Sequence, residues 1–94
     1  MRRSTPDLRR GEPILPFVYL LRCRDGSLYT GAAKDVAARL RQHQAGRASR
    51  YTRGRLPVQL VWSRRLRSWS RALREEWRIK QLPRAEKERL VAGA

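Results

Sequence analysis

The sequence predicts a small α+β domain in which a three-stranded antiparallel sheet is flanked by helices, in the order strand, strand, helix, strand, helix, helix. Three observations support this fold class. The chain has 94 residues, which is enough for one domain with a small core. The pair Asp25-Gly26 separates two runs of strand-forming residues, as is typical of a β-hairpin. Later segments change to the helical spacing of apolar residues.

The three predicted strands are rich in Val, Leu, Tyr and Trp, which favour extended backbone. They lie at residues 17–23, 27–32 and 58–62. The first two form the hairpin. The number of residues in its turn decides which face each side chain occupies, because directly paired residues share a face of the sheet.

Two registers of the hairpin are compatible with the sequence. A two-residue turn at Asp25-Gly26 places Tyr19 and Tyr29 on opposite faces. A three-residue loop, with Gly26 in the left-handed conformation, pairs Tyr19 with Gly31 and places both tyrosines and Gly31 on one face. Only the second register forms a site, in which Gly31 is expected to leave an open floor where a phosphate can approach.

Three helices follow from apolar spacing and from start and stop signals. The first is predicted from about residue 35 to 45, with Gly46 as a left-handed stop. The others are predicted at 70–82 and 83–92, the last beginning at Pro83. Residues 46–56 carry four arginines and two glycines without periodicity, and we expect an exposed basic loop there.

Charge is the strongest signal in the composition. The chain has 23 Lys and Arg against 8 Asp and Glu, a formal net charge of +15, which favours a polyanionic partner. The basic residues are spread over the whole length rather than along one helix face, so nucleic acid is expected and a membrane is not. Residues 1–13 are interpreted as a flexible basic tail, and residues 14–94 as the domain.

The location in the cell follows from what the sequence lacks. The longest nearly apolar run, residues 14–21, is too short to span a bilayer, and no export signal is visible. A single cysteine, Cys23, fits a reducing compartment. We therefore expect a cytoplasmic protein, associated with the nucleoid, and a monomer.

Polar residues occur at unexpected places on two predicted helices. On the first, Arg39 and His43 lie one turn apart at the edge of an apolar stripe, either as boundary residues or as phosphate ligands. On the later helix, Glu76 falls inside an apolar arc formed by Trp69, Ala72, Leu73 and Ile79. A carboxylate there needs a partner, which is either Lys80 in an ordinary ion pair or a metal ion.

Four segments together resemble the GIY-YIG nuclease superfamily, in particular its small stand-alone bacterial members. FVYLL is similar to the first name-giving motif, and Tyr29-Thr30-Gly31 to the second. KDVAARLRQHQAG resembles the helix with the catalytic arginine, and ALREEWRIKQL the segment with the metal-binding glutamate. The resemblance runs from residue 17 to about residue 91. Phe17 stands where the family has glycine, and Ala32-Ala33 where it often has hydroxyl residues.

The resemblance implies a metal-dependent phosphodiesterase. Glu76 would hold one Mg²⁺ or Mn²⁺, and Arg39 would stabilise charge on the phosphoryl oxygens. Tyr19 would be, or would position, the general base, which requires nearby cations to lower the pKa of its phenol. Tyr29 and His43 would orient phosphate and water, with His43 as the alternative base.

Further residues are expected to contact phosphate or DNA. They are Gly31, Lys34, Arg47, Arg50, Arg53, Arg55 and Lys80. The expected function is structure-specific DNA cleavage in repair or processing, with specificity supplied by DNA structure or by a protein partner. The alternative is a non-catalytic module that binds DNA or RNA. A third interpretation, a protein-interaction adaptor, depends on exposure of Trp62, Trp69 or Trp77, which we expect in the core.

Overall fold

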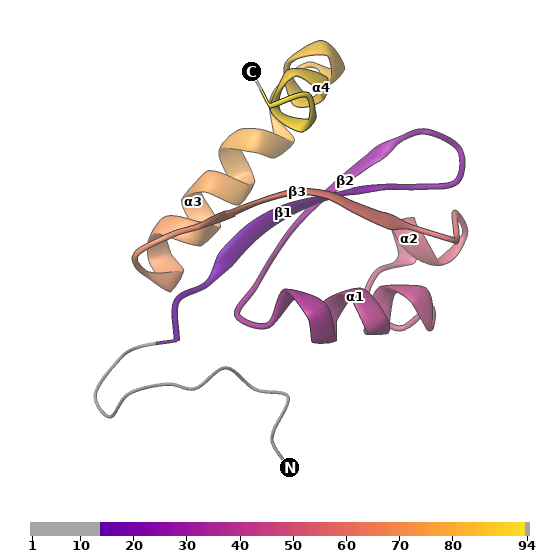
Figure 1. Cartoon of the computed structure of the whole chain (residues 1–94), viewed down its shortest axis with the longest axis horizontal. Helices are drawn as coiled ribbons and strands as arrows, with labels where there is room; N and C mark the ends of the chain where they lie inside the picture. Colours follow the sequence, from indigo (N-terminus) through magenta and orange to yellow (C-terminus); the bar gives the residue numbers. More distant parts are fainter. Residues whose placement is uncertain (1–13, 94) are drawn as a thin grey trace.

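A computed structural model describes residues 14–93 (Figure 1). It contains three strands and four helices: β1 (Phe17–Arg22), β2 (Leu28–Ala33), α1 (Val36–Gln44), α2 (Arg50–Arg53), β3 (Gln59–Arg65), α3 (Trp69–Lys80) and α4 (Arg84–Val91). The predicted α+β fold is confirmed. One element was not predicted, because the single-turn helix α2 lies inside the segment expected to be an exposed loop. The predicted tail, residues 1–13, lies outside the described residues.

The sheet is antiparallel with strand order β2-β1-β3, so β2 and β3 are its two edges. In the hairpin Tyr19 pairs with Gly31 and Leu21 with Tyr29. Cys23 N donates to Ser27 O at 2.9 Å, and Gly26 has a φ of 88°. This is the three-residue loop with a left-handed glycine. Tyr19, Tyr29 and Gly31 therefore share one face of the sheet.

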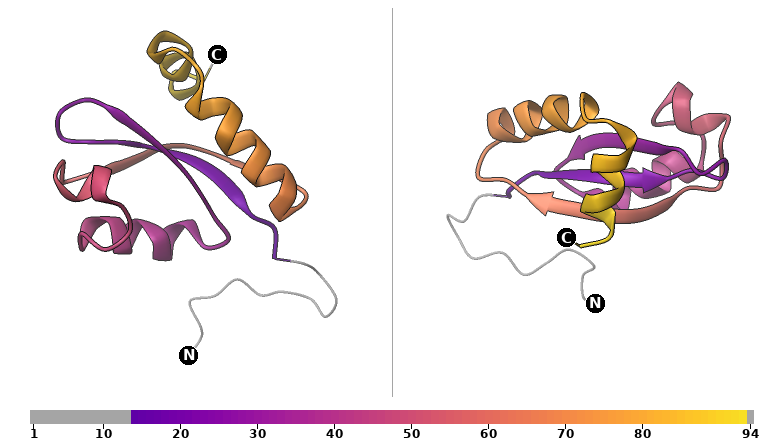
Figure 2. Two further views of the ribbon diagram at one scale, coloured as in Figure 1. Left: turned by 180° about the vertical axis from the view of Figure 1, so that it is seen from behind. Right: turned by 90° about the horizontal axis from the view of Figure 1, so that it is seen from above.

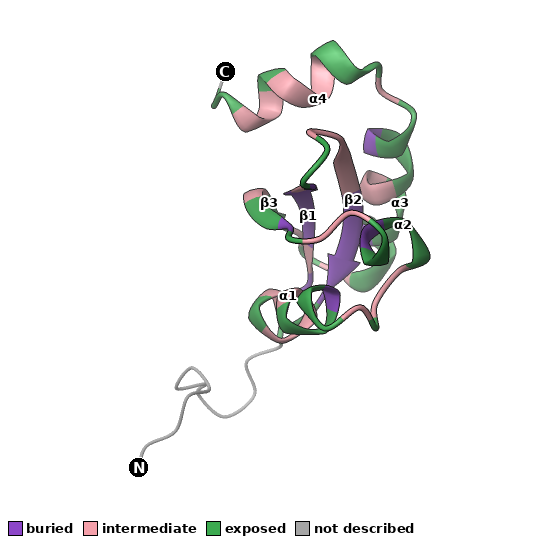
Figure 3. Cartoon of the chain, turned by 90° about the vertical axis from the view of Figure 1, so that its right-hand side faces the viewer, coloured by how far each residue is buried: buried purple, intermediate pink, exposed green. Residues whose placement is uncertain are grey.

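The two faces of the sheet carry separate cores, because successive side chains of a strand point to opposite faces. Val18, Leu20 and Ala32 pack with Ala72 and Ile79 of α3. On the other face, residues of β1 and β2, among them Tyr19, Leu21 and Ala33, pack against α1. In Figures 1 and 2 α3 lies on one side of the sheet and α1 on the other. Figure 3 shows that the buried residues lie mainly in β1 and β2, whereas β3 has none.

Capping residues explain where α1 begins and ends and where α3 begins. The side chain of Asp35 accepts a hydrogen bond from Ala38 N at 2.9 Å at the start of α1. Gly46, with a φ of 77°, follows the last turn of α1, as predicted. Ser68 caps α3 in the same manner by accepting from Arg71 N at 3.1 Å.

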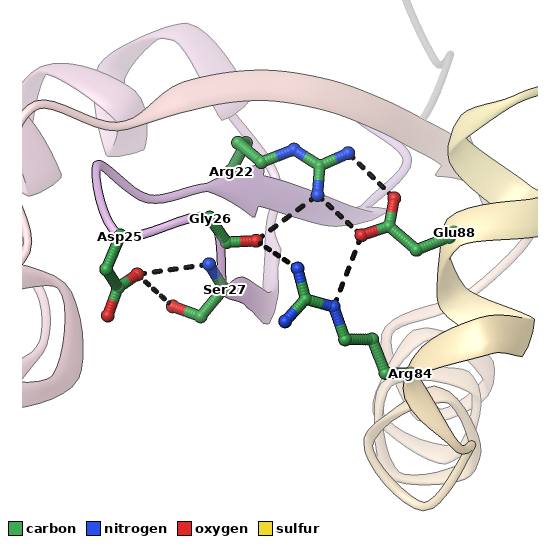
Figure 4. Close-up of polar contacts among 6 residues, drawn as sticks. All are labelled: Arg22, Asp25, Gly26, Ser27, Arg84 and Glu88. Carbon is green, nitrogen blue, oxygen red and sulfur yellow. Dashed lines mark hydrogen bonds and ion pairs between the residues drawn. The ribbon is translucent and has the colours of Figure 1, made fainter.

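Helix α4 is fastened to the hairpin by a polar cluster (Figure 4). Arg22 donates two hydrogen bonds to the carboxylate of Glu88, at 2.6 and 2.8 Å. Arg84 donates to the carbonyl oxygen of Gly26 at 2.9 Å. The bidentate pair joins the end of β1 to the middle of α4 and so fixes the position of that helix over the turn.

The expected burial of the α3 tryptophans is wrong. Only Ala72 and Ile79 of the predicted apolar arc are buried, whereas Trp69 and Trp77 are 41% and 66% exposed and Leu73 is also exposed. Trp62 on β3 is partly buried. The physical reason is the small size of the sheet. Its three strands cover only a narrow strip of α3 that contains Ala72 and Ile79. Within residues 14–93 no helix has the length and apolar character needed to cross a membrane.

Candidate active site

The site begins with a buried chain of hydrogen bonds that joins three elements. Tyr19 Oη, from β1, lies 2.9 Å from His43 Nε2 on α1. His43 Nδ1 lies 2.9 Å from Thr52 Oγ1 on α2. His43 and Thr52 both have no exposed surface. His43 is thus a core residue as well as a polar one, and both of its ring nitrogens have partners.

The surroundings of Thr52 define where the protons lie in this chain. Thr52 Oγ1 donates to the carbonyl oxygen of Ser49 at 3.4 Å, an atom that can only accept. Thr52 Oγ1 therefore accepts from the Nδ1–H of His43. His43 Nε2 is then unprotonated and accepts from the hydroxyl group of Tyr19. The chain is ordered so that a proton on Tyr19 can pass to His43.

Gly31 has a different role from the one expected. Its Cα faces the phenol ring of Tyr19, and a Cβ built at position 31 would collide with Oη, Cζ and Cε1 of that ring. The predicted open floor for a phosphate is therefore wrong, because the ring of Tyr19 fills the space. The glycine lets the phenol lie across β2, which is an edge strand, and so brings the Tyr19 hydroxyl toward the sheet edge.

Aromatic rings extend the site from β2 to α2. The ring of Tyr29 meets His43 edge to face, with 5.1 Å between centroids, and stacks on Tyr51 at 6.0 Å. The guanidinium carbon of Arg55 lies 3.9 Å from the centre of the Tyr51 ring. These contacts order the α2 segment against β2.

The pKa of Tyr19 moves in the direction opposite to the one expected. Burial raises the pKa of Tyr19 to about 12, and Tyr29 adds to the rise. The cation Arg39 lowers the pKa of Tyr19, and the carboxylate of Glu76 raises it, but both effects are smaller than that of burial. The expected fall of this pKa is therefore wrong, because the lowering by Arg39 is smaller than the rise caused by burial. Arg39 and Glu76 are thus two charged groups that act on the Tyr19 hydroxyl in opposite directions.

The pKa of His43 is shifted downward by the same buried environment. Burial lowers the pKa of His43 below its usual value of 6.5, and the nearby Arg39 lowers it further. The imidazole is consequently neutral at pH 7 and able to accept a proton. His43 has no exposed surface and Tyr19 is itself only 1% exposed, so a proton can reach His43 only through the hydroxyl group of Tyr19.

Two adjacent glutamates on α3 have different partners. Glu75 accepts hydrogen bonds from Arg64 at 2.7 Å and from Arg78 at 2.8 and 2.9 Å, and the pKa of Glu75 is lowered, chiefly by the bonds from Arg78. Glu76 has one ion-pair partner in the described part of the chain, Lys80 at 3.3 Å. The side chain of Glu76 is 19% exposed. Glu75 is therefore a structural residue that joins α3 to β3, and Glu76 is available for a ligand.

The carboxylate of Glu76 is the type of ligand that a magnesium ion prefers. Residues 14–93 contain no cluster of three or more His, Cys, Asp or Glu side chains placed to hold a metal ion. A single carboxylate, with water and substrate phosphate as the other ligands, is a common arrangement for Mg²⁺ and also suits Mn²⁺. The ammonium group of Lys80, 3.3 Å from the carboxylate of Glu76, shows that a positive charge fits beside this residue.

Two hollows adjoin these residues. One, of about 300 Å³, is lined by residues that include Tyr29, Tyr51 and Lys80. The other, of about 530 Å³, includes Lys34, Arg39 and Trp69. Lys80 thus lines one hollow with Tyr29, and Lys34 lines the other with Arg39.

The remaining predicted phosphate ligands lie in or beside α2. Arg47, Arg50 and Arg53 are exposed. Arg55 is engaged elsewhere, because its Nε lies 3.0 Å from Asp25 and its guanidinium covers Tyr51. Arg55 therefore has a structural role as well as its charge.

Sequence reasoning missed Thr52 and Tyr51, which both lie in the segment taken for a loop. The available signal was Ser49, whose side chain accepts from Tyr51 N at 3.0 Å and caps α2. Ser49 followed by Arg-Tyr-Thr-Arg forms a single helical turn, in which Thr52 is buried and Tyr51 is partly exposed. A single turn is too short for apolar periodicity to reveal it.

Comparison with known proteins agrees with this geometry. Residues 15–89 match the family model described as the GIY-YIG catalytic domain, and the chain belongs to the GIY-YIG family. This is a nuclease domain, which indicates endonuclease activity on DNA, and such nucleases generally use divalent metal ions.

Within this family the chain is similar to small proteins named UPF0213. It is 48% identical over 75 residues to a UPF0213 protein of Oceanobacillus iheyensis, covering 80% of this chain and 87% of that one. It is 52% identical over 77 residues to one of Klebsiella pneumoniae, covering 82% and 73%. The solution NMR structure of a UPF0213 protein from Bacillus halodurans matches with a TM-score of 0.54 and 44% identity over 83% of each chain.

Proposed function

We propose that this protein hydrolyses phosphodiester bonds of DNA with the help of one divalent metal ion held by Glu76. The observation that supports the proposal is the ordered Tyr19–His43–Thr52 chain on one side of β2, together with the carboxylate of Glu76, whose ion-pair partner Lys80 lines a hollow with Tyr29. A purely binding protein has no use for a buried proton-accepting histidine connected to a phenol.

Tyr19 and His43 together would remove the proton of the attacking water. With a pKa of about 12, Tyr19 holds its own proton at neutral pH and cannot act as a free phenolate. It would accept the water proton while its hydroxyl proton passes to His43 Nε2, 2.9 Å away. Thr52 then stabilises the imidazolium by accepting from Nδ1. This ordering makes His43 the final proton acceptor.

The other residues would act on the phosphate. Glu76 would hold the Mg²⁺ or Mn²⁺ ion, which would supply positive charge to the scissile phosphate and the leaving oxygen. Arg39, within reach of Tyr19, would stabilise the charge that grows on the phosphoryl oxygens, and the hydroxyl of Tyr29 would orient them. Lys34, in the hollow that Arg39 also lines, would contact the strand beyond the site. A role in DNA repair or processing is part of this proposal.

The two glutamates of α3 give a matched test. Glu76→Gln and Glu75→Gln remove the same charge at adjacent positions of one helix. Labelled single-stranded, duplex and branched DNA would be incubated with each variant in Mg²⁺, Mn²⁺ or EDTA, and variant folding would be checked by circular dichroism. We expect Glu76→Gln to lose metal-dependent cleavage by about 100-fold or more while DNA binding persists.

Glu75→Gln is expected to lose stability rather than chemistry, because its partners are Arg64 and Arg78. Cleavage by Glu76→Gln at the parental rate would disprove the assignment. Absence of metal-dependent cleavage by the parent protein on every DNA form would instead favour the non-catalytic binding module.

A further inference from the structure

We infer that the hollow of about 300 Å³ beside the site binds a backbone phosphate of the nucleic-acid strand, next to the phosphate that is cleaved. This hollow, the lysine hollow, is lined by Leu28, Tyr29, Thr30, Tyr51, Lys80 and Lys87. The inference deepens the proposed function and rests on it for the identity of the strand. The binding chemistry of the hollow can be tested apart from cleavage.

The charge of the lysine hollow calls for an anion. Two of its lining residues are lysines and none is acidic. Lys80 is paired with Glu76, whereas Lys87 is half-buried and makes no ion pair within residues 14–93. A partly desolvated cation without a counter-charge is unfavourable, and a phosphate in the hollow would offset that cost.

The polar groups of the hollow favour phosphate oxygens over a stacked base. The ring of Tyr51 is already engaged by Arg55, 3.9 Å from its centre, and by the stacked ring of Tyr29. Its ring is therefore not a free stacking surface, and its hydroxyl is the group that we expect to meet the phosphate. Thr30 adds a second hydroxyl: its side chain is 3% exposed, and Oγ1 is a buried atom without a hydrogen-bond partner in the described part of the chain. Because Oγ1 has almost no exposed surface, the proposal requires the Thr30 side chain to turn toward the hollow, where a phosphate oxygen can accept from it.

The position of the hollow suits a neighbouring phosphate of the same strand. Lys80 lines the hollow and also lies 3.3 Å from Glu76, so one side chain borders both sites. Lys87 is held over the hollow because the next residue, Glu88, is clamped by Arg22 at 2.6 and 2.8 Å (Figure 4). The helix that carries the cation is thus fixed in advance of binding.

The test compares Lys87→Gln with Arg89→Gln. Both remove one positive charge from α4, but Arg89 is exposed and outside the hollow. Binding of a fluorescent 12-nucleotide single-stranded DNA is measured in EDTA over a range of salt concentrations, so that no cleavage occurs. For Lys87→Gln we expect binding weakened about fivefold and the salt slope reduced by about 0.7, as for one phosphate that is no longer neutralised. For Arg89→Gln we expect a change of less than about twofold.

Equal losses in the two variants would overturn the inference, since they would reflect general charge alone. Tyr51→Phe adds an independent arm, because it keeps the ring contacts and removes only the hydroxyl. It is expected to weaken binding by about two- to threefold, as for one neutral hydrogen bond, and unchanged binding would count against the hollow. Cleavage assays separate the two proposals. If Glu76→Gln still cleaves DNA, the metal site is refuted. The phosphate site in the lysine hollow is then accepted or rejected from the binding of Lys87→Gln alone.

Discussion

The phenol ring of Tyr19 occupies the space that a side chain at position 31 would fill. This close approach has two consequences. It brings the hydroxyl of Tyr19 to the β2 edge, where Arg39 and Glu76 act on it, and it buries the ring so that the pKa of Tyr19 rises. A single glycine therefore sets both the position and the protonation of the central phenol.

Gly31→Ala is predicted to disrupt this arrangement. The new Cβ would collide with the Tyr19 ring, and relief of the clash requires the ring or β2 to move. We expect the free energy of unfolding to fall by about 1–3 kcal/mol and DNA cleavage to be lost. Chemical denaturation measures the first effect. Gly54→Ala is the control, because no atom lies within 4 Å of a Cβ built there; equal stability losses in both variants would contradict the explanation.

The sole histidine of the chain allows a direct pH prediction. Burial lowers the pKa of His43 in the folded protein below the 6.5 of a free side chain. As the pH falls, the unfolded chain therefore takes up this proton before the folded chain does. The contribution of neutral His43 to stability is complete above pH 6.5 and is lost as the pH falls through the lower folded-state pKa.

NMR titration of the single imidazole should give a pKa below 6.5. Melting temperature should fall on acidification below that pH, and this part of the fall should be absent from His43→Gln. A measured pKa at or above 6.5 would show that the buried Tyr19–His43–Thr52 chain is not arranged as described.

At the scale of elements, α4 depends on its polar attachment to the hairpin. None of the α4 residues is buried, so its contacts with the sheet through Leu90 and Val91 are only partial. The Arg22–Glu88 pair supplies the fixed geometry that this limited apolar contact does not.

Glu88→Gln should therefore loosen α4 selectively. The neutral amide cannot accept the two charge-assisted bonds from Arg22, and Arg22 and Arg84 then repel each other. We expect faster amide hydrogen exchange in residues 84–91, with protection of β1 unchanged. Glu86→Gln, which loses only the exposed pair with Arg89, is the control. Exchange that rises equally in all elements would indicate global destabilisation instead.

The sequence predicted those elements whose signals are local. Asp25-Gly26, Asp35 and Gly46 mark turns and helix ends through their own backbone preferences, and the structure has them in these roles. The hairpin register could not be chosen, because both turn lengths are compatible with the same residues. It is fixed by packing of the Tyr19 side of the sheet against α1.

Long-range contacts account for what the sequence did not reveal. Thr52 acquires its role only because α2 folds back onto His43, and nothing in Arg-Tyr-Thr-Arg indicates that partner. The exposure of Trp77 likewise follows from the width of the sheet rather than from the helix. Tyr19, Tyr29 and His43, named from the sequence, contact one another, but the burial that sets the pKa of Tyr19 comes from the complete fold.

At the scale of the whole molecule, acidic side chains are mostly engaged in ion pairs, whereas many basic side chains are not. Among the described residues, Asp25, Glu75, Glu76, Glu86 and Glu88 are all engaged in ion pairs. Among residues 14–93, most Lys and Arg side chains have no ion-pair partner, and they contribute much of the formal net charge of +15. Binding a polyanion relieves their mutual repulsion, so DNA should stabilise the fold as well as occupy the site.

The α2 segment and the opposite edge of the sheet offer a test of how this charge is used. Arg50 and Arg53 are exposed on α2, whose Tyr51 lines the lysine hollow, whereas Arg65 and Arg67 are exposed at the end of β3, the edge farthest from β2. If DNA crosses the site at the β2 edge, Arg50→Gln with Arg53→Gln should weaken duplex binding. The log–log salt slope should flatten by about 1.8, which is about 0.9 for each phosphate that these arginines neutralise.

The matched pair Arg65→Gln with Arg67→Gln removes the same charge and should change the slope by less than about 0.5, since only long-range electrostatics is altered. Fluorescence anisotropy in EDTA measures both variants without cleavage. A slope change that is equal for the two pairs would mean that DNA binds the protein by total charge, without preference for the β2 edge. A larger change for the β3 pair would place the DNA at the opposite edge of the sheet, away from Tyr19 and Glu76. The main DNA-binding surface would then not be the proposed active site.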